Sequence, residues 1–477
     1  MRDLSRYAKL FALALGSALL VFLWARQISG ASIEKDAAQM VRMALNLERH
    51  GVISLDEAPP FSPTNYREPL PAVVTALGIR IIDAVEGEAP PEAYFSGRRV
   101  ELLKYQNVLW LALLSLGAFY AARSLTASGA LALLCVVLVN YAVLRGEADL
   151  IDNLDTDIQA ATLLMLASAA LAAAVARRRP GLWLLAGALF GVLTLIKAAV
   201  LYIFAGTAFV LACVYLMRRV PLAVAGRDLA SFVAAFALAV APWMYRNHVQ
   251  LGSAHISQRA GVVLMYRAVY DQMTPTEYRG TFYVWAPLRL QGVFGRLLGF
   301  SPADLARNGR LQRLNDDGDS AFAPEDLAAE RAGAPERTLS YYRQARAERE
   351  KLETELASLG PVRSEIEADD RLKAKATKIV LEHPWRELGL TASFLWRGAT
   401  LAFPFLVFAL CVALRRRRDD LLLFAVPAFG TVMLYALVTH FIARYDFASL
   451  EVALVAIVAS LNALVRAPGA SRASGAP

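Results

Sequence analysis

The chain has 477 residues, of which 57% are hydrophobic and 19% charged, and its mean hydropathy is +0.41. Soluble domains average about 45–50% apolar and about 25% charged residues. A soluble protein of this size has no interior that would hide so much apolar surface, so the composition predicts an integral membrane protein. It excludes a disordered, collagen-like or disulfide-stapled chain, and the three cysteines, Cys135, Cys213 and Cys411, all lie in apolar runs.

Apolar stretches long enough for a helix to cross a bilayer, which takes roughly 20 residues, recur along the chain. We predict ten spans, at 8–28, 105–122, 125–144, 158–176, 181–196, 198–217, 229–245, 391–414, 421–440 and 446–465. The first has an alternative as a signal peptide, because Ser29-Gly30-Ala31 is similar to a small-x-small cleavage site. Its apolar run from Leu10 to Ala25 is long for a signal peptide, so we expect it to be retained.

The charges between the spans set the orientation. The proposed inner segments carry 16 cations and four acids, a balance of +12, whereas the whole chain carries +8. The positive-inside rule therefore places both termini on the inner side. The pI near 9.4 reflects these short clusters, one at each inner turn, and they form no basic patch for a nucleic acid. The predicted fold is an all-α integral membrane protein of about ten transmembrane helices.

Two large segments remain on the outer side, and they divide the chain. We expect an N-terminal transmembrane core at 1–245 that includes an outer loop at 29–104, a mostly helical extracytoplasmic segment at 246–390, three transmembrane helices at 391–465 and a disordered tail at 466–477. A short acidic loop joins the third and fourth spans. Its acids are Glu147, Asp149, Asp152, Asp155 and Asp157.

Three outer segments have helical patterns. The pattern of residues 33–50 predicts an amphipathic helix with Ser32 as its N-cap. We expect its apolar stripe to rest on the membrane face of the protein and Asp36 to point away from that stripe. Residues 70–82 are too short to span and predict a helix lying in the interface. Residues 301–383 predict a helical hairpin interrupted at Gly360-Pro361, which is either a spacer or lid or a partner-binding coiled coil.

Ionisable residues at the outer ends of the spans are the candidates for chemistry, because charge at membrane depth is costly. The orientation places five of them on one face: Asp36, Arg67, Lys197, Arg246 and Arg444. One carboxylate and several cations around a common cavity favour chemistry on an anionic substrate.

Each of these residues also has a purely structural interpretation. The arginines would then anchor helix ends at the lipid headgroups, Lys197 would snorkel from a tight turn, and Asp36 would be a first-turn helix acid. The acidic loop would be a solvated loop, and Glu451 would pack against Arg444.

Metal and nucleotide sites have no support in the sequence. The five histidines, His50, His248, His255, His383 and His440, lack HExxH or Cys/His ligand spacing. There is no P-loop, no dinucleotide-binding glycine motif and no GxSxG elbow. We therefore expect no cofactor. A divalent metal stays an alternative without support from ligand spacing, because His248 and His255, seven residues apart, would share one face if that stretch is helical.

Short motifs in a fixed order resemble one known class of proteins. They are Asp36 within 36–44, Gly51, Arg67-Glu68-Pro69-Leu70-Pro71, Pro242-Trp243 with Arg246-Asn247, Gly261, His383-Pro384-Trp385 and Arg444-Tyr445. Their order and common side resemble the GT-C membrane glycosyltransferases, the group of the dolichyl-phosphate-mannose–protein mannosyltransferases and the bacterial lipid A aminoarabinose transferases. The chain departs from that pattern at Ala37, where many relatives have a second acid, at Lys197, which is often Arg, and at Asp446-Phe447-Ala448.

The resemblance implies a function and a set of site residues. It implies a sugar donor on polyprenyl phosphate, a lipid, glycan or protein acceptor, inverting transfer on the periplasmic face of a bacterial inner membrane, and Asp36 as the general base. The expected substrate-binding residues are Arg67, Glu68, Lys197, Arg246, Arg444, Tyr445 and Asp155.

Two other functions fit a cavity lined by cations. One is a polyprenyl-linked glycan flippase or other transporter, which more often has internally repeated halves, and we find no repeat. The other is a transferase of the O-antigen polymerase or ligase type that uses outer arginines and no aspartate base.

Overall fold

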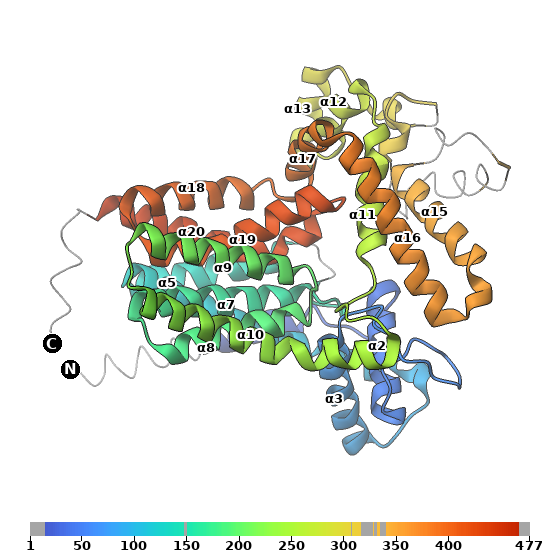
Figure 1. The fold of residues 1–477 in the computed structure, drawn as a ribbon, viewed down its shortest axis with the longest axis horizontal. Helices are drawn as coiled ribbons and strands as arrows, with labels where there is room; N and C mark the ends of the chain where they lie inside the picture. The colour runs from blue at the N-terminus through green and yellow to red at the C-terminus, as the bar shows by residue number, and fades with distance from the viewer. Residues whose placement is uncertain are drawn as a thin grey trace. The chain divides into compact units, whose positions relative to one another are not determined.

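The computed structural model describes residues 15–146, 150–306, 308–315, 328, 332–333 and 340–466. Every regular element in this part of the chain is a helix, which confirms the predicted all-α class (Figure 1). The start of the first predicted span, the acids Glu147 and Asp149, and the tail from 467 onward lie outside the described residues.

Contacts divide the chain into two compact units. The first unit comprises Met1–Ile256, Pro404–Gly430 and Phe447–Pro477, and the second comprises Ser257–Phe403 and Thr431–Asp446. This grouping differs from the division at 245 and 390 expected from the sequence, because residues of the last three predicted spans fall in both units.

Among the described residues, six helices are long and apolar enough to cross a membrane, or seven if a bent pair of helices counts as one span. They are Arg98–Thr126, which joins α4 (Arg98–Lys104) and α5 (Gln106–Thr126), and α7 (Asp157–Arg177), α9 (Val200–Met217), α10 (Leu222–Leu251), α19 (Asp419–Val438) and α20 (Ala443–Val465). Shorter apolar helices cover three further predicted spans: Leu15–Ala25, α6 (Gly129–Arg145) and α8 (Pro180–Thr194). The protein is therefore a multi-pass membrane protein.

The predicted span 391–414 is wrong as a continuous helix. The chain forms α17 (Pro384–Gly398) and α18 (Ala402–Arg416), which are bent by 106° at the break between them. At the end of α17 the ring of Phe441 lies so close that a Cβ on Gly398 would be 2.5 Å from its Cγ. Pro404 stands in the first turn of α18, where its missing N–H costs no helical hydrogen bond.

The predicted span 229–245 is too short. Helix α10 begins at Leu222 and ends at Leu251, and Gly252 caps it with a left-handed φ of 71°. Gly187 and Gly191 of α8 lie against the backbone of α10, and a Cβ on Gly191 would be 2.5 Å from the Cβ of Ala239. Such close packing of small residues keeps the two helices together across the proline at 242.

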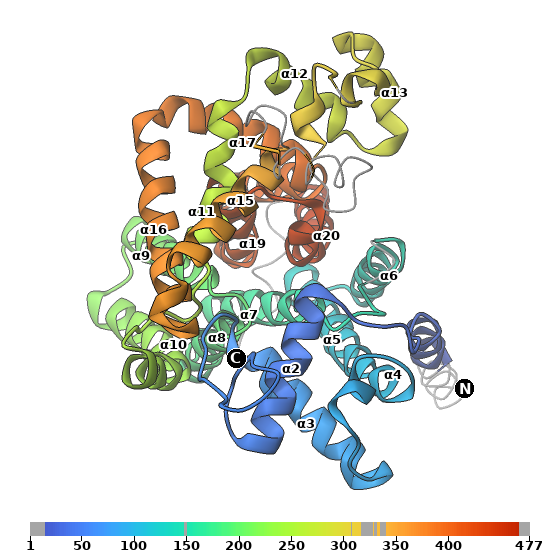
Figure 2. The ribbon, with the colours of Figure 1, turned by 90° about the vertical axis from the view of Figure 1, so that its right-hand side faces the viewer.

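The amphipathic helix after the first span is α2 (Lys35–His50), and its N-cap is Glu34 rather than the predicted Ser32. Its apolar stripe is buried, and it packs against α3 (Pro69–Glu86), η1 (Pro91–Tyr94) and α4. Figure 2 shows α2 beside α3. That the stripe rests on the membrane face of the protein stays a prediction. Helix α3 is longer than the predicted 70–82. Its outward stripe of Val73, Leu77, Ile81 and Val85 is exposed.

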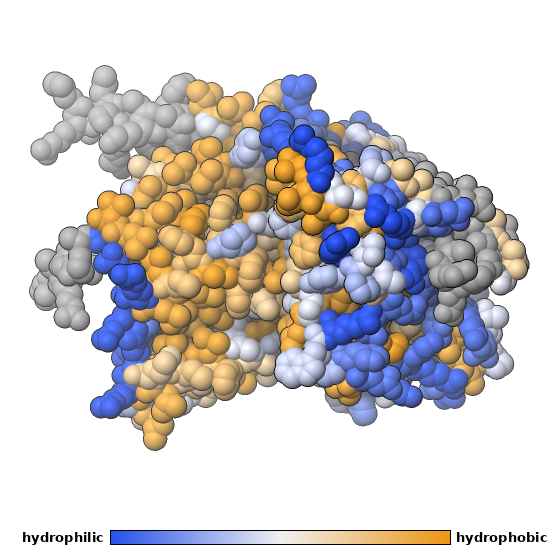
Figure 3. All heavy atoms as spheres, turned by 90° about the horizontal axis from the view of Figure 1, so that it is seen from above, coloured by the Kyte–Doolittle hydropathy of each residue, from blue (hydrophilic) through white to orange (hydrophobic). Residues whose placement is uncertain are grey.

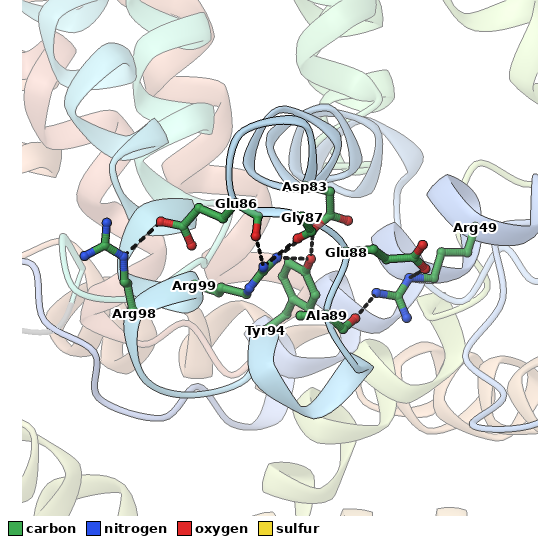
Figure 4. A network of polar contacts seen from close by, with 9 residues as sticks. All are labelled: Arg49, Asp83, Glu86, Gly87, Glu88, Ala89, Tyr94, Arg98 and Arg99. Atoms are coloured by element: carbon green, nitrogen blue, oxygen red, sulfur yellow. Dashed lines mark hydrogen bonds and ion pairs between the residues drawn. The ribbon is translucent and has the colours of Figure 1, made fainter.

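A polar cluster closes the far end of these outer helices (Figure 4). Arg99 of α4 donates to the Asp83 carboxylate and to the Tyr94 hydroxyl, each over 2.6 Å, and to the carbonyl oxygen of Gly87 over 2.6 Å. Burial and the neighbouring Asp83 raise the pKa of Tyr94, so this phenol stays a donor to Asp83. Arg49 of α2 donates to the backbone nearby at Ala89. The cluster thereby fixes the end of α3 to α2 and α4.

The basic inner turns gather at one end of the first unit. Arg218, after α9, pairs with Asp419 at the start of α19 over 2.7 Å. Arg418 donates over 2.9 Å to the carbonyl oxygen of Leu125 at the end of α5. In Figure 3 the broad apolar surface ends on one side at a rim of hydrophilic residues. The residues that set the predicted orientation thus share an end of the bundle.

The second unit holds α11 (Ala260–Ala268), η2 (Val269–Gln272), α12 (Pro275–Val284), α13 (Leu288–Leu298), η3 (Pro302–Leu305), η4 (Gln312–Leu314), α15 (Tyr341–Glu355), η6 (Ala357–Leu359), α16 (Pro361–Glu382) and α17. Helices α15 and α16 form the predicted hairpin, with its break at Gly360. Helix α11 packs closely on α16. A Cβ at Gly261 would overlap the carbonyl oxygen of Asp369, so this approach requires a glycine.

Cysteine labelling tests the orientation that the inner arginines predict. We start from a chain in which Cys135, Cys213 and Cys411 are replaced by alanine or serine. A membrane-impermeant maleimide added to intact cells should label Lys351→Cys in α15 and leave Arg415→Cys unlabelled until the membrane is permeabilised. Labelling of position 415 in intact cells would reverse the orientation.

Candidate active site

The centre of the candidate site is a pair between α2 and the loop before α3. A carboxylate oxygen of Asp36, in the first turn of α2, accepts from Nη2 of Arg67. Gln39 lies one helical turn after Asp36, and its Oε1 accepts from Nε of Arg67 over 2.9 Å and from Nη2 over 2.6 Å. The Arg67 side chain is 6% exposed and that of Asp36 38%. The cation is therefore a buried anchor, whereas the carboxylate is partly exposed to solvent.

The loop that carries Arg67 is tied to the turn between α8 and α9. The Glu68 carboxylate accepts from the N–H of Ala198 over 3.0 Å, and the N–H of Leu70 donates to the carbonyl oxygen of Leu195 over 3.1 Å. Pro69 opens α3 at a position where its missing N–H costs nothing. The loop thus has a fixed course between two spans.

The same turn presents Lys197 to the start of α7. Its Nζ lies 3.2 Å from Oδ1 of Asp157, whose side chain is 5% exposed. Asp155 is also buried, and its Oδ2 accepts from the Asn153 side chain over 3.0 Å. The interpretation of this segment as a solvated loop is therefore wrong for Asp155 and Asp157. Lys197 forms an ion pair with Asp157, so it does more than extend towards the lipid headgroups.

Arg246 of α10 reaches the loop from a third side. Its Nη1 donates to the carbonyl oxygen of Thr64 over 3.1 Å, and its guanidinium lies 4.7 Å from the centroid of the Trp243 ring. Asn65 and Asn247 both donate to the carbonyl oxygen of His255, which holds the end of α10 beside the loop. The loop 64–70 thus connects the elements that carry five predicted site residues: Asp36, Arg67, Glu68, Lys197 and Arg246.

The remaining predicted site residues belong to the second unit. Tyr445 lies among aromatic rings, with ring centroids 5.5 Å from Tyr435 and 5.8 Å from His440. Arg444 precedes it in the first turn of α20. The participation of Arg444 and Tyr445 in the site stays a prediction.

Sequence reasoning missed three supporting residues. Gln39 is a neutral side chain, and only its spacing of three residues from Asp36 places it on the same helix face. Asp157 was one of five loop acids with no feature to single it out. Lys104 is fully buried, and its Nζ donates to the carbonyl oxygens of Ser29 and Ala31 and pairs with Asp152 over 3.0 Å. It fixes the chain just before α2, and hence the position of Asp36.

No group of three potential metal ligands exists among the residues that the structure describes. His50 stacks on Phe61 with centroids 4.2 Å apart, which is a packing role. The absence of a metal from the reaction stays a prediction.

No protein-family model and no curated protein matches the sequence. Two solved structures are similar to the chain. ArnT from Cupriavidus metallidurans in the apo state is 13% identical, with a TM-score of 0.40, and the match covers 96% of this chain and 78% of that chain. The same protein bound to undecaprenyl phosphate is 14% identical, with a TM-score of 0.36, and the match covers 92% of this chain and 77% of that chain. Both TM-scores are too low to establish a common fold.

The unequal burial of the central pair makes a prediction about stability. Arg67→Gln should lower the midpoint of thermal unfolding by several °C, because it removes a buried side chain that donates to Asp36 and Gln39 and leaves a buried amide in its place, at a cost of about 1–3 kcal/mol. Asp36→Asn should change it little, because the side chain is partly exposed and the amide oxygen still accepts from Arg67. The control is Arg42→Gln on the same helix as Asp36, which removes an exposed ion pair with Glu57 of the following loop. Equal losses in the Asp36 and Arg67 variants would contradict the anchor role.

Proposed function

We propose that the protein is an inverting glycosyltransferase of a bacterial inner membrane. It would move a sugar from a polyprenyl-phosphate donor to a lipid, glycan or protein acceptor on the outer face. The observation that carries the proposal is the pair of Asp36 and Arg67, in which a buried guanidinium holds an accessible carboxylate beside a loop that also contacts Arg246 and the turn of Lys197. The sequence resemblance to the GT-C enzymes supports the same reaction.

The proposed chemistry needs one base and a site for a phosphate. Asp36 takes the proton of an acceptor hydroxyl as that oxygen attacks the anomeric carbon. The bond between the anomeric carbon and the phosphate oxygen breaks with its electron pair on oxygen. Polyprenyl monophosphate then leaves, and the configuration at the anomeric carbon inverts. The proton passes from Asp36 to solvent.

The cations would take up the charge that grows on the leaving phosphate. Guanidinium and ammonium groups bind phosphate oxygens by charge-assisted hydrogen bonds, which strengthen as the leaving group gains charge. Lys197 and Arg246 would supply this stabilisation, without a metal. Arg67 already binds Asp36 and Gln39, so its main task is to orient the base. Glu68 would act by positioning the turn that carries Lys197.

Replacing the proposed base gives the first test. Asp36→Asn keeps the shape and the hydrogen bond to Arg67, so the purified protein should still fold and bind donor. Sugar transfer in nanodiscs should fall roughly 10²–10⁴-fold, the usual contribution of a positioned general base. Asp36→Glu should also be slow, because it moves the carboxylate by about one methylene, and about 1 Å matters in such a site.

Transfer at near the wild-type rate by the Asn variant would reject Asp36 as the base. Glu68, Asp155 and Glu34 would then be tested in that order. Glu57→Gln, on the outer loop, is the matched control for removing a carboxylate outside the site.

The cations give an independent test. Lys197→Gln and Arg246→Gln should raise the KM for the donor more than the KM for the acceptor, because the donor alone carries the phosphate. Arg246→Lys should also impair donor use, because an ammonium lacks the planar fork of a guanidinium. Arg80→Gln, on the exposed face of α3, is the control. Unchanged donor kinetics in both site variants would leave only the structural roles of these cations.

A further inference from the structure

Helix α13 of the second unit has its apolar residues on the outside. Leu297 is 75% exposed, Val293 50% and Leu290 43%, and Gly295 is the only buried residue of the helix. An amphipathic helix packed on a water-soluble body would bury these side chains. The reversed arrangement indicates that something apolar covers this face.

The packing of α13 explains which face is left open. The backbone at Gly295 lies against the Tyr283 ring, whose Cε2 would be 3.0 Å from an added Cβ. At 100° per residue, Leu290, Val293 and Leu297 lie on the opposite side from Gly295. The glycine side of the helix is therefore its attachment to α12, and the apolar side faces outward.

Two arginines border the apolar face. Arg289 and Arg296 are seven residues apart, which is about two helical turns, so they lie on one edge of the helix. Both are exposed, and the helix contains no acidic residue. Basic side chains beside exposed leucines are typical of helices that lie in a lipid headgroup region.

A second contact joins α13 to the helix that precedes an apolar helix. The ring of Phe294 lies 5.0 Å from Trp396 of α17, measured between centroids. Trp396 stands six residues before Ala402, the first residue of the apolar helix α18. Tryptophan is enriched at membrane interfaces. Helix α17 also exposes Trp385 and Leu388, so it continues the apolar surface.

We propose that α13 lies in the headgroup region of the outer leaflet. Leu290, Val293 and Leu297 enter the acyl boundary, and Arg289 and Arg296 bind the phosphates of anionic phospholipids. The surface attaches the second unit to the bilayer through a site distant in sequence from its spans. The proposal rests on the membrane character of the chain and is independent of the proposed transferase activity.

Fluorescent labels at single cysteines test this placement. The full-length protein, with its three natural cysteines replaced, receives a bimane label at Leu297→Cys or at Gly292→Cys. Position 292 is the matched control, because it lies on the opposite side of the same helix and a Cβ there meets no atom within 4 Å. Each protein is placed in nanodiscs of phosphatidylcholine with or without phosphatidylglycerol. Quenching by nitroxide-labelled lipid is compared with quenching by aqueous iodide.

The label at 297 should be quenched several-fold more by the nitroxide lipid than the label at 292, and iodide should show the reverse order. Arg289→Gln with Arg296→Gln should reduce lipid quenching at 297 and abolish its increase with phosphatidylglycerol. Equal access of both labels to iodide would overturn the proposal. A label at 297 that is protected from both quenchers and shows self-quenching between labels would also overturn the proposal. That result would indicate that a second copy of the chain covers this face.

Discussion

The candidate site depends on the burial of one guanidinium. Taking Arg67 out of water is costly unless its donors are satisfied. Gln39 and Asp36 accept from it on the side of α2, and the ring of Tyr66 lies 5.5 Å from it. The geometry of Asp36 therefore follows from the course of the Arg67 loop, and any element that moves this loop moves the carboxylate.

Several spans hold that loop in place. The turn between α8 and α9 binds it through Glu68 and Leu70, and α10 binds it through Arg246. On the other side, the fully buried Lys104 ties the chain before α2 to Asp152. Backbone and side-chain bonds of this kind make the site part of one end of the bundle. This is the rigid support that positioned acid–base chemistry requires.

Hydropathy predicted the helical class and the approximate positions of most apolar helices, because apolar length is a property of the local sequence. Hydropathy did not reveal the break after Gly398, since the two helices on either side of it are together as apolar as one span. The ring of Phe441, which packs against Gly398, is distant in sequence. The extra length of α10 was missed for a related reason, because its last turns are polar and are held by the Arg67 loop. Asp36 and Arg67 could be chosen from sequence as rare charges beside spans, whereas Gln39 and Asp157 become visible only when partners distant in sequence are brought together.

The central claim is that the Asp36 carboxylate drives transfer from a polyprenyl-phosphate sugar. Its most direct test is mass spectrometry of the polyprenyl phosphates in an envelope-lipid extract from a deletion strain, incubated with the purified protein in nanodiscs. The account predicts that one sugar-carrying polyprenyl phosphate falls while polyprenyl monophosphate rises in equal amount, with wild-type protein and not with Asp36→Asn. An unchanged lipid profile with wild-type protein, or equal turnover by both proteins, would contradict it.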